Sequence, residues 1–284
     1  MNNHDHTLIP TMLGDDSSNP PPSTLQPTRL DGTRTLEMLG AGDSAYRPGL
    51  LTATEADEAF AALMPAGGEI EYQQWHAMPN PKKPNAPLHP LRRLKIAMAT
   101  PDASTGRVPH YRFPVNNQHR HGVITPMTPT VDAIRTRVEA VTGIEFNHAV
   151  VLLYRDGNDC IGFHKDKMLD LDPTSPIVSV SLGAVRTYVL RDDIFNPTVQ
   201  YELPLGHGSL MVLGPESNGT LYHSIRKPSE SDLLRAPALH TEVRISLTFR
   251  KVATFVDAES RLHGQGAEHL SLNWPEALRG AHRL

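Results

Sequence analysis

The feature that most constrains the fold is a series of short apolar segments in the second half of this 284-residue chain. Apolar residues recur there with a period of two or in short runs, and turn residues such as Asp156-Gly157 and Gly214-Pro215 separate them. This pattern predicts β-strands rather than helices. The expected strands are Ala149–Tyr154, Ile177–Leu182, Thr187–Leu190, Val199–Leu203, Ser209–Leu213 and Val243–Phe249.

Two helices are expected before these strands. The first begins near Thr54, with acidic residues in its first turn, and ends at Gly67. The second has Thr128 as its N-cap, Pro129 at its first helical position and Gly143 as its end. Its apolar stripe consists of Val131, Ile134, Val138 and Val141. Two helices followed by many short strands predict an α+β, mainly β protein with a double-stranded β-helix (jelly-roll) core and supporting helices on one face.

The two ends of the chain have a different composition. Residues 1–44 carry prolines among polar residues and are expected to be a disordered tail, and residues 255–284 are expected to form a C-terminal appendage. No run of ~18 apolar residues is present, so no membrane span is expected. Met1–Pro22 has no apolar segment, so we expect no secretory signal. The single cysteine, Cys160, favours a reducing compartment, the cytoplasm or, in a eukaryote, the nucleus.

Charge is distributed unevenly along the chain. The segment His76–His121 holds eight basic residues and one acidic residue, a balance of about +7, so the remainder carries about −11 to give the overall −4. The basic residues are Lys82, Lys83, Arg92, Arg93, Lys95, Arg107, Arg112 and Arg120. A basic segment on an acidic protein indicates a local anionic partner, and a solvated basic loop is the plainer alternative.

A metal-binding pattern lies between two of the expected strands. In Gly162-Phe163-His164-Lys165-Asp166 an imidazole and a carboxylate are two residues apart, and in an extended segment both point to the same side. A third ligand must come from elsewhere, and the chain returns through Tyr222-His223-Ser224. Two histidines and one carboxylate are the ligands of non-haem iron(II) oxygenases. Taken alone, His-x-Asp is a weak signal that a surface pair also satisfies.

The last expected strand alternates polar and apolar residues. Arg244, Ser246, Thr248 and Arg250 share one face. The two arginines lie ~20 Å apart on a flat strand and closer on a curved one. Guanidinium groups bind carboxylates by paired hydrogen bonds, so this face suits a dicarboxylate; an exposed basic face is the alternative.

Four phrases, in this order, carry a family signature. They are Tyr154–Asp166, Ser175–Ala184, His207–Leu210 continuing through Tyr222–Ser224, and Arg244–Arg250. Together they resemble the AlkB family of iron(II)/2-oxoglutarate dioxygenases over about residues 70 to 252. The resemblance implies one domain at residues 45–254, with a substrate lid at 70–125 and the jelly-roll core at 147–252. We expect it to be a monomer.

The resemblance also implies the chemistry of the site. Iron(II) would be bound by His164, Asp166 and His223, which are thereby the catalytic residues. The 2-oxoglutarate co-substrate would be held by Tyr154, Arg244, Ser246 and Arg250. Such enzymes use O2 to oxidise a C–H bond, often in the N-methyl group of an alkylated nucleic-acid base, and release succinate and formaldehyde.

Several positions differ from the family pattern. Leu152 and Ser246 stand where the family has asparagines near the co-substrate. Lys167 and Met168 follow the metal aspartate where repair enzymes carry an acid that reads the base. In the lid, Pro114 replaces the serine of a turn. These changes bear on substrate choice rather than on the oxygenase core.

Three functions remain open at this stage. The first is demethylation of nucleic acid, with Tyr111, Arg112, Phe113 and Met168 expected to contact the substrate. The second is oxidation of a small specialised metabolite. The third is a non-catalytic binding module, which is disfavoured because all three ligands and both arginines are present.

Overall fold

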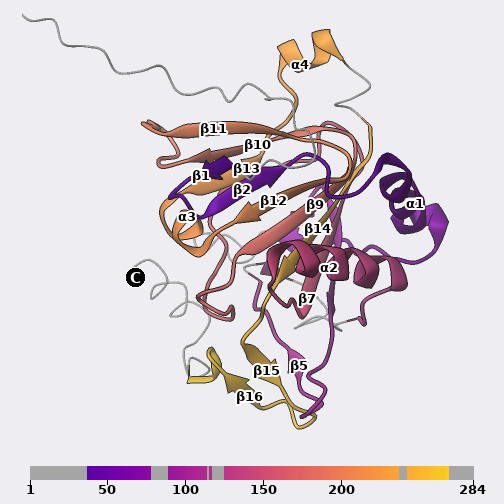
Figure 1. Cartoon of the computed structure of the whole chain (residues 1–284), viewed down its shortest axis with the longest axis vertical. Coiled ribbons are helices and arrows are strands. Elements are labelled where there is room, and N and C mark those ends of the chain that lie inside the picture. The colour runs from indigo at the N-terminus through magenta and orange to yellow at the C-terminus, as the bar shows by residue number, and fades with distance from the viewer. Residues whose placement is uncertain (1–36, 78–88, 114, 117–124, 237–241, 269–284) are drawn as a thin grey trace, which may run out of the picture.

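The structure is a computed structural model that describes residues 37–77, 89–113, 115–116, 125–236 and 242–268. Two antiparallel sheets make up most of it (Figure 1). The larger sheet has the order β1 (Glu37–Leu39), β2 (Ser44–Arg47), β12 (Ser209–Leu213), β9 (Ile177–Gly183), β14 (Arg244–Arg250), β7 (His148–Tyr154) and β4 (Leu94–Ala99). The smaller sheet has the order β11 (Gln200–Leu205), β10 (Arg186–Arg191), β13 (Tyr222–Ile225) and β8 (Ile161–His164).

Two short sheets complete the strands. One has the order β16 (Leu262–Gly264), β15 (Thr254–Val256) and β5 (Val108–Pro109), and the other pairs β3 (His76–Ala77) with β6 (Val115–Asn116). The predicted jelly-roll core is confirmed, and each of the six expected strands is present with ends shifted by at most one residue, except that β11 extends to Leu205.

Two helices cover the outer face of the larger sheet (Figure 1). The first, α1 (Ala53–Leu63), begins at a capping box in which Thr52 and Glu55 satisfy each other's backbone N–H groups. The second, α2 (Pro129–Thr142), begins at Thr128 and ends at Gly143, as predicted. Shorter helical segments are a 3-10 turn at Pro65–Gly67, α3 (Pro215–Thr220) and α4 (Glu230–Arg235). No helix in the described ranges is long and apolar enough to span a membrane.

The core has two parts. One lies between the helices and the larger sheet, and it contains Val131, Ile134 and Val138 of α2 together with Ile245 and Leu247 of β14. The other lies between the two sheets and is lined by aromatic and aliphatic residues from both. Val141, which was expected in the stripe of α2, is 38 % exposed and lies one residue before the end of the helix.

Three stretches next to the predicted domain boundaries take part in sheets. Residues 37–44 join the larger sheet through β1 and the start of β2, so this part of the predicted tail is structured and is anchored by the buried Leu39. β4, within the predicted lid range, pairs with β7 of the larger sheet. β15 and β16, within the predicted C-terminal appendage, form a sheet with β5. The remainder of both predicted tails, 1–36 and 269–284, lies outside the described residues.

Candidate active site

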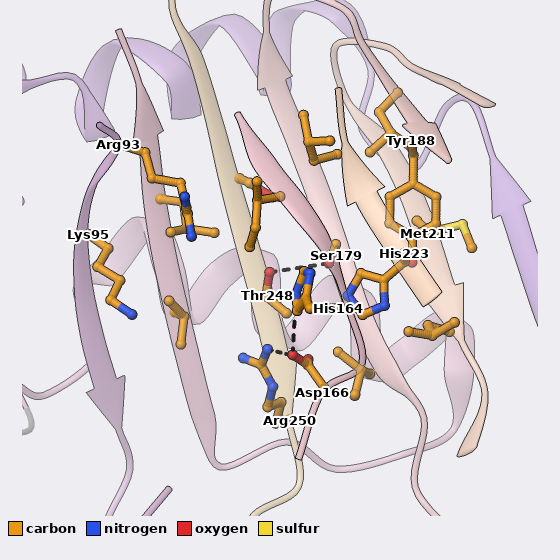
Figure 2. Close-up of a pocket in the computed structure, with 18 of the residues that line it drawn as sticks. Arg93, Lys95, His164, Asp166, Ser179, Tyr188, Met211, His223, Thr248 and Arg250 are labelled. Atoms are coloured by element: carbon orange, nitrogen blue, oxygen red, sulfur yellow. Dashed lines mark hydrogen bonds and ion pairs between the residues drawn. The ribbon is translucent and has the colours of Figure 1, made fainter. Parts of the chain in front are cut away.

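The three predicted metal ligands come together because β8 pairs with β13. His164, the last residue of β8, is directly opposite His223 in the register, and their ring centroids are 4.1 Å apart. Asp166 follows His164 by two residues, and its Oδ1 lies 3.8 Å from His164 Nε2. One ligand atom from each of the three residues lies within 4.8 Å of the others (Figure 2). This spacing suits a single metal ion with the remaining coordination positions open.

Neighbouring groups fix the orientation of these ligands. His164 Nδ1 is 2.9 Å from the carbonyl of Gly162, and donation of its proton there leaves Nε2 free to bind a metal. Tyr188 stacks on His223 with a ring-centroid distance of 5.7 Å. The buried Asn218 accepts from the backbone N–H of Asp166 and donates to its carbonyl, both at 2.9 Å.

The electrostatics of the triad favour the forms that bind a cation. Burial raises the pKa of Asp166, but Arg250 and the two histidines outweigh burial and lower that pKa below its usual value. Burial, followed by the neighbouring His164, lowers the pKa of His223 to about 3. Asp166 is therefore ionised and His223 neutral near pH 7, as metal ligation requires.

The polar face of β14 points into the space between the sheets, beside the triad. Arg244 and Arg250 are buried, with 1 % and 7 % exposure, so the alternative of an exposed basic face is wrong. Arg244 donates to Ser181 Oγ at 2.9 Å and to Ser246 Oγ at 3.3 Å. Its guanidinium carbon lies 4.9 Å from the centroid of the Tyr154 ring. Arg250 Nη2 is 2.5 Å from Asp166 Oδ2.

Both arginines carry buried N–H groups without a hydrogen-bond acceptor among the described residues. The Nε and Nη1 atoms of Arg244 and Arg250 are buried and have no hydrogen-bond partner among the described residues. Buried unpaired donors are costly, so an acceptor is expected to meet them. A dicarboxylate supplies carboxylate oxygens at both ends, and the residues present therefore fit 2-oxoglutarate as well as a metal ion.

A cavity of about 200 Å³ joins these groups. All three triad residues line it, as do the four residues predicted to hold the co-substrate, Tyr154, Arg244, Ser246 and Arg250. Tyr111 and Phe113 also line it, with their rings edge to face at 4.8 Å. The structure thus places two of the four predicted substrate residues at the cavity.

The other two predicted substrate residues lie elsewhere. Arg112 alternates with Tyr111 and Phe113 and points to the opposite side, where it pairs with the buried Asp170 at 2.5 Å and donates to the carbonyl of Gly266. Met168 does not line the cavity and packs against the core between the sheets, whereas Lys167 does line it. Met168 was expected near the site because it follows Asp166 by two residues, but β8 has already ended at His164, and Met168 begins a turn in which its carbonyl accepts from the N–H of Leu171.

Sequence reasoning missed three further residues, of which Lys95 and Tyr188 line the cavity and Asn218 holds the backbone of Asp166. Asn218, Tyr188 and Lys95 come from α3, β10 and β4, and none carries a local signal that links it to the triad. The one usable signal is the alternation of side chains along β4, which places Lys95 on the opposite face from Ile96 and therefore toward the space between the sheets.

Comparison with known proteins identifies the family. Residues 43–250 match the model of the 2OG-Fe(II) oxygenase superfamily. DNA oxidative demethylase ALKBH2 of Mus musculus is 41% identical over 133 residues, which is 45% of this chain and 52% of the relative. The Homo sapiens protein of the same name is 39% identical over 45% of this chain and 48% of its own length. Alpha-ketoglutarate-dependent dioxygenase alkB homolog 3 of Rattus norvegicus is 28% identical over 44% of this chain and 41% of its own length.

The chain therefore spans about half the length of the curated relatives that it matches. The matched segment of the superfamily model includes every ligand of the triad and both arginines of β14. The resemblance to the AlkB family is confirmed, and the chain belongs to the 2OG-Fe(II) oxygenase superfamily.

Proposed function

We propose that this protein is an iron(II)- and 2-oxoglutarate-dependent dioxygenase that removes an N-methyl group from an alkylated nucleic-acid base. The observation that carries the proposal is the single cavity that joins the His164, Asp166 and His223 triad to the unpaired donors of Arg244 and Arg250. The relatives named DNA oxidative demethylase support the choice of substrate class.

In this proposal each residue has a defined task. His164, Asp166 and His223 would hold iron(II), and Arg250, next to Asp166, would bind one carboxylate of 2-oxoglutarate. Arg244, assisted by Ser246 and Tyr154, would bind the other carboxylate. The metal and co-substrate supply the oxidising power for C–H hydroxylation.

The overall reaction balances without another reductant. One oxygen atom of O2 enters the methyl group and the other enters succinate, while 2-oxoglutarate supplies two electrons and loses CO2. The hydroxymethyl group then leaves the base nitrogen as formaldehyde, and the nitrogen gains a proton. Tyr111 and Phe113 offer aromatic surfaces at the cavity against which a flipped base can stack.

The basic segment contributes less surface charge than its composition indicates. Of its eight basic residues, Lys82, Lys83 and Arg120 lie outside the described residues, Arg93 and Lys95 line the cavity, and Arg112 is paired with Asp170. Arg92 is exposed and Arg107 half-buried, and these are the described residues of this segment best placed for phosphate contacts.

The test is turnover of methylated single- and double-stranded oligonucleotides, with formaldehyde and succinate both measured. We expect the two products in equal amounts, and their loss in His223→Ala. An enzyme that binds iron and 2-oxoglutarate but releases no substrate-dependent formaldehyde would contradict the nucleic-acid proposal and favour a small metabolite as substrate. Arg92→Ala and Arg107→Ala should each reduce the salt dependence of oligonucleotide binding if phosphate contacts contribute.

A further inference from the structure

Lys95 is a buried cation on the cavity side of β4. Ile96 and Met98 of this strand point to the helices, so Lys95 points to the space between the sheets. Only 6 % of its surface is exposed. Its Nζ lies 3.6 Å from the centroid of the Trp75 ring and 4.4 Å from that of Phe113. Two aromatic faces therefore hold the ammonium group in one place, by cation–π attraction.

Lys95 forms no ion pair with a carboxylate among the described residues. The negative charge of Asp166 acts on it from within the cavity, but Asp166 is already paired with Arg250. A buried, unpaired ammonium is costly. Burial, followed by the charges of Arg93 and Arg250, lowers the pKa of Lys95 well below its usual value, and an acceptor hydrogen-bonded to the ammonium favours the charged form. An oxygen acceptor that entered the cavity would supply the partner that this cation lacks.

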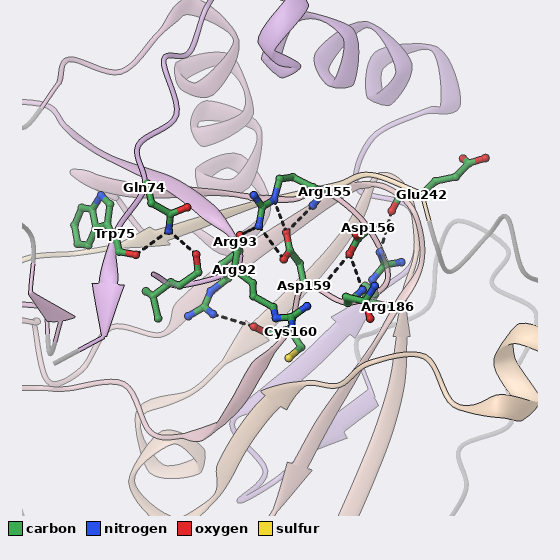
Figure 3. Close-up of polar contacts among 12 residues, drawn as sticks. Gln74, Trp75, Arg92, Arg93, Arg155, Asp156, Asp159, Cys160, Arg186 and Glu242 are labelled. Carbon is green, nitrogen blue, oxygen red and sulfur yellow. Dashed lines mark hydrogen bonds and ion pairs between the residues drawn. The ribbon is translucent and has the colours of Figure 1, made fainter. Parts of the chain in front are cut away.

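Arg93 adds a second cation to the same wall (Figure 2). It precedes Lys95 by two residues and donates to the carbonyl of Cys160 at 2.9 Å, while its Nε is buried without a partner among the described residues. A second contact fixes the backbone just before Arg93. Arg155, which pairs with Asp159, donates to the carbonyl of Arg92 (Figure 3).

The cavity as a whole is strongly cationic. Asp166 is the one carboxylate that lines it in the described ranges, and Arg250 already neutralises this group. The cations that line it are Arg93, Lys95, Lys165, Lys167, Arg244 and Arg250. If Arg244 and Arg250 bind the co-substrate, the other cations that line the cavity still outnumber its one lining carboxylate in the described ranges. Like charges in a desolvated site repel, so a cationic substrate is disfavoured.

Methylated bases divide into two groups by this criterion. 1-Methyladenine and 3-methylcytosine are cations near pH 7, and an amino group lies beside the methylated nitrogen. 1-Methylguanine and 3-methylthymine are neutral, and a ring carbonyl lies beside that nitrogen. An ammonium group donates hydrogen bonds only, so it complements the carbonyl and opposes both the amino group and the positive charge.

We propose that the cavity selects neutral N-methylated bases with a ring carbonyl beside the methylated nitrogen, and that Lys95 determines this selectivity by donating a hydrogen bond to that carbonyl. The inference rests on the nucleic-acid demethylase function proposed above and names the substrate class within it. Arg93 supports the selection through its charge, and Trp75 and Phe113 keep the ammonium in position.

The experiment compares oligonucleotides of one sequence that differ only in the lesion, 1-methylguanine against 1-methyladenine and 3-methylthymine against 3-methylcytosine. The measured quantity is the ratio of kcat/KM within each pair. We expect the wild-type protein to favour the neutral base. Lys95→Met should lower that ratio by about 10- to 100-fold, the effect of one charged hydrogen bond. Lys95→Glu should reverse the preference.

A second readout does not depend on turnover. The chain has two tryptophans, so in a Trp274→Phe background Trp75 is the sole tryptophan reporter beside Lys95. Quenching of its fluorescence by the same oligonucleotides should show tighter binding of the neutral lesions, and Lys95→Met should remove the difference. If Lys95→Glu does not fold, Lys95→Met carries both tests. The matched control is Lys227→Glu, an exposed charge reversal away from the cavity, which should change neither ratio.

The outcomes separate the two proposals. If no oligonucleotide is demethylated by a protein that binds iron and 2-oxoglutarate, the nucleic-acid function fails and this inference fails with it. If oligonucleotides are demethylated but the wild type favours cationic lesions, or Lys95→Met leaves the ratios unchanged, this inference alone is overturned. A raised 2-oxoglutarate requirement in Lys95→Met with an unchanged lesion ratio would assign Lys95 to the co-substrate instead.

Discussion

Arg250 and Asp166 form a buried ion pair, with Nη2 of the arginine 2.5 Å from Oδ2 of the carboxylate. One partner is a proposed metal ligand and the other a proposed co-substrate ligand. Because they share a charge-assisted hydrogen bond, any change at one site alters the electrostatics of the other. Binding of iron and of 2-oxoglutarate is therefore expected to be coupled through this pair.

Arg250→Ala tests this coupling. Loss of one partner of a buried charged pair typically costs ~2–5 kcal/mol. We expect the apparent 2-oxoglutarate requirement to rise by tens to thousands of fold, and iron affinity to change as well, measured by titrating each while the other is saturating. Arg261→Ala, at an exposed arginine, is the control. An unchanged co-substrate curve would refute the role of Arg250.

His223→Ala tests the metal assignment. Removal of this ligand should abolish turnover and bound iron(II) while leaving the circular dichroism spectrum nearly unchanged, since the side chain faces the cavity. His263→Ala, at a histidine paired with Asp257, should leave metal content unchanged. Full activity and metal content in His223→Ala would mean that the metal is bound elsewhere.

Asn218→Ala tests a positioning residue that the sequence did not reveal. Asn218 holds the backbone of Asp166 through two hydrogen bonds and does not touch the metal position itself. Loss of such outer contacts typically costs 10–100-fold in metal affinity. We expect iron(II) or manganese(II) titrations to show this weakening with the global fold preserved. Equal affinity in the variant would show that the contacts are only structural.

Arg112→Ala should act on stability rather than on substrate. Arg112 compensates the charge of Asp170, which is 2 % exposed, and its removal leaves a buried carboxylate unpaired. We expect a loss of ~3–5 kcal/mol in the free energy of unfolding, measured in urea. The salt dependence of oligonucleotide binding should stay as in the wild type; a reduced slope would show that Arg112 contacts the oligonucleotide, as the sequence analysis expected.

The buried His148 is expected to make the folded protein less stable at acidic pH. Burial, followed by the charge of Arg250, lowers its pKa to about 3, whereas an unfolded histidine titrates near ~6.5. Between these values the unfolded chain binds a proton that the folded protein does not, so stability falls as pH drops below about 6.5. The slope is up to ~1.4 kcal/mol per pH unit. In His148→Asn this loss of stability at low pH should be absent. Urea midpoints of both proteins, measured from about pH 4 to about pH 7, test this because the range spans most of the window between the two pKa values. Equal slopes in both proteins would exclude His148 as the source.

The parts of the fold that the sequence predicted well depend on local chemistry. The ends of α2 follow from Thr128, Pro129 and Gly143, each of which acts within one helical turn. The strands follow from period-two alternation, and the polar face of β14 was assigned correctly because Arg244 and Arg250 differ in parity from their apolar neighbours. That His223 lies beside His164 could be predicted only from the motifs that resemble the AlkB family.

The parts that failed depend on contacts distant in the chain. Asn218 and Asp166 are 52 residues apart, and nothing near either residue indicates that they meet. Lys95 looked like surface charge because its burial is decided by Trp75 and Phe113, which reach it from other segments. Arg112 was assigned to substrate by position alone, and its partner Asp170 lies 58 residues away.

The pairing of β15 with β5 links the C-terminal part of the described chain to the segment that carries Tyr111 and Phe113. His110, directly after β5, donates its backbone N–H to Thr254, and the chain then continues into Tyr111 and Phe113. A protein cut after Lys251 would keep every proposed metal and co-substrate ligand yet lose this brace. We expect such a truncated enzyme to oxidise 2-oxoglutarate futilely, releasing succinate without matching formaldehyde, so that the coupling efficiency of the reaction depends on strands that hold none of its ligands.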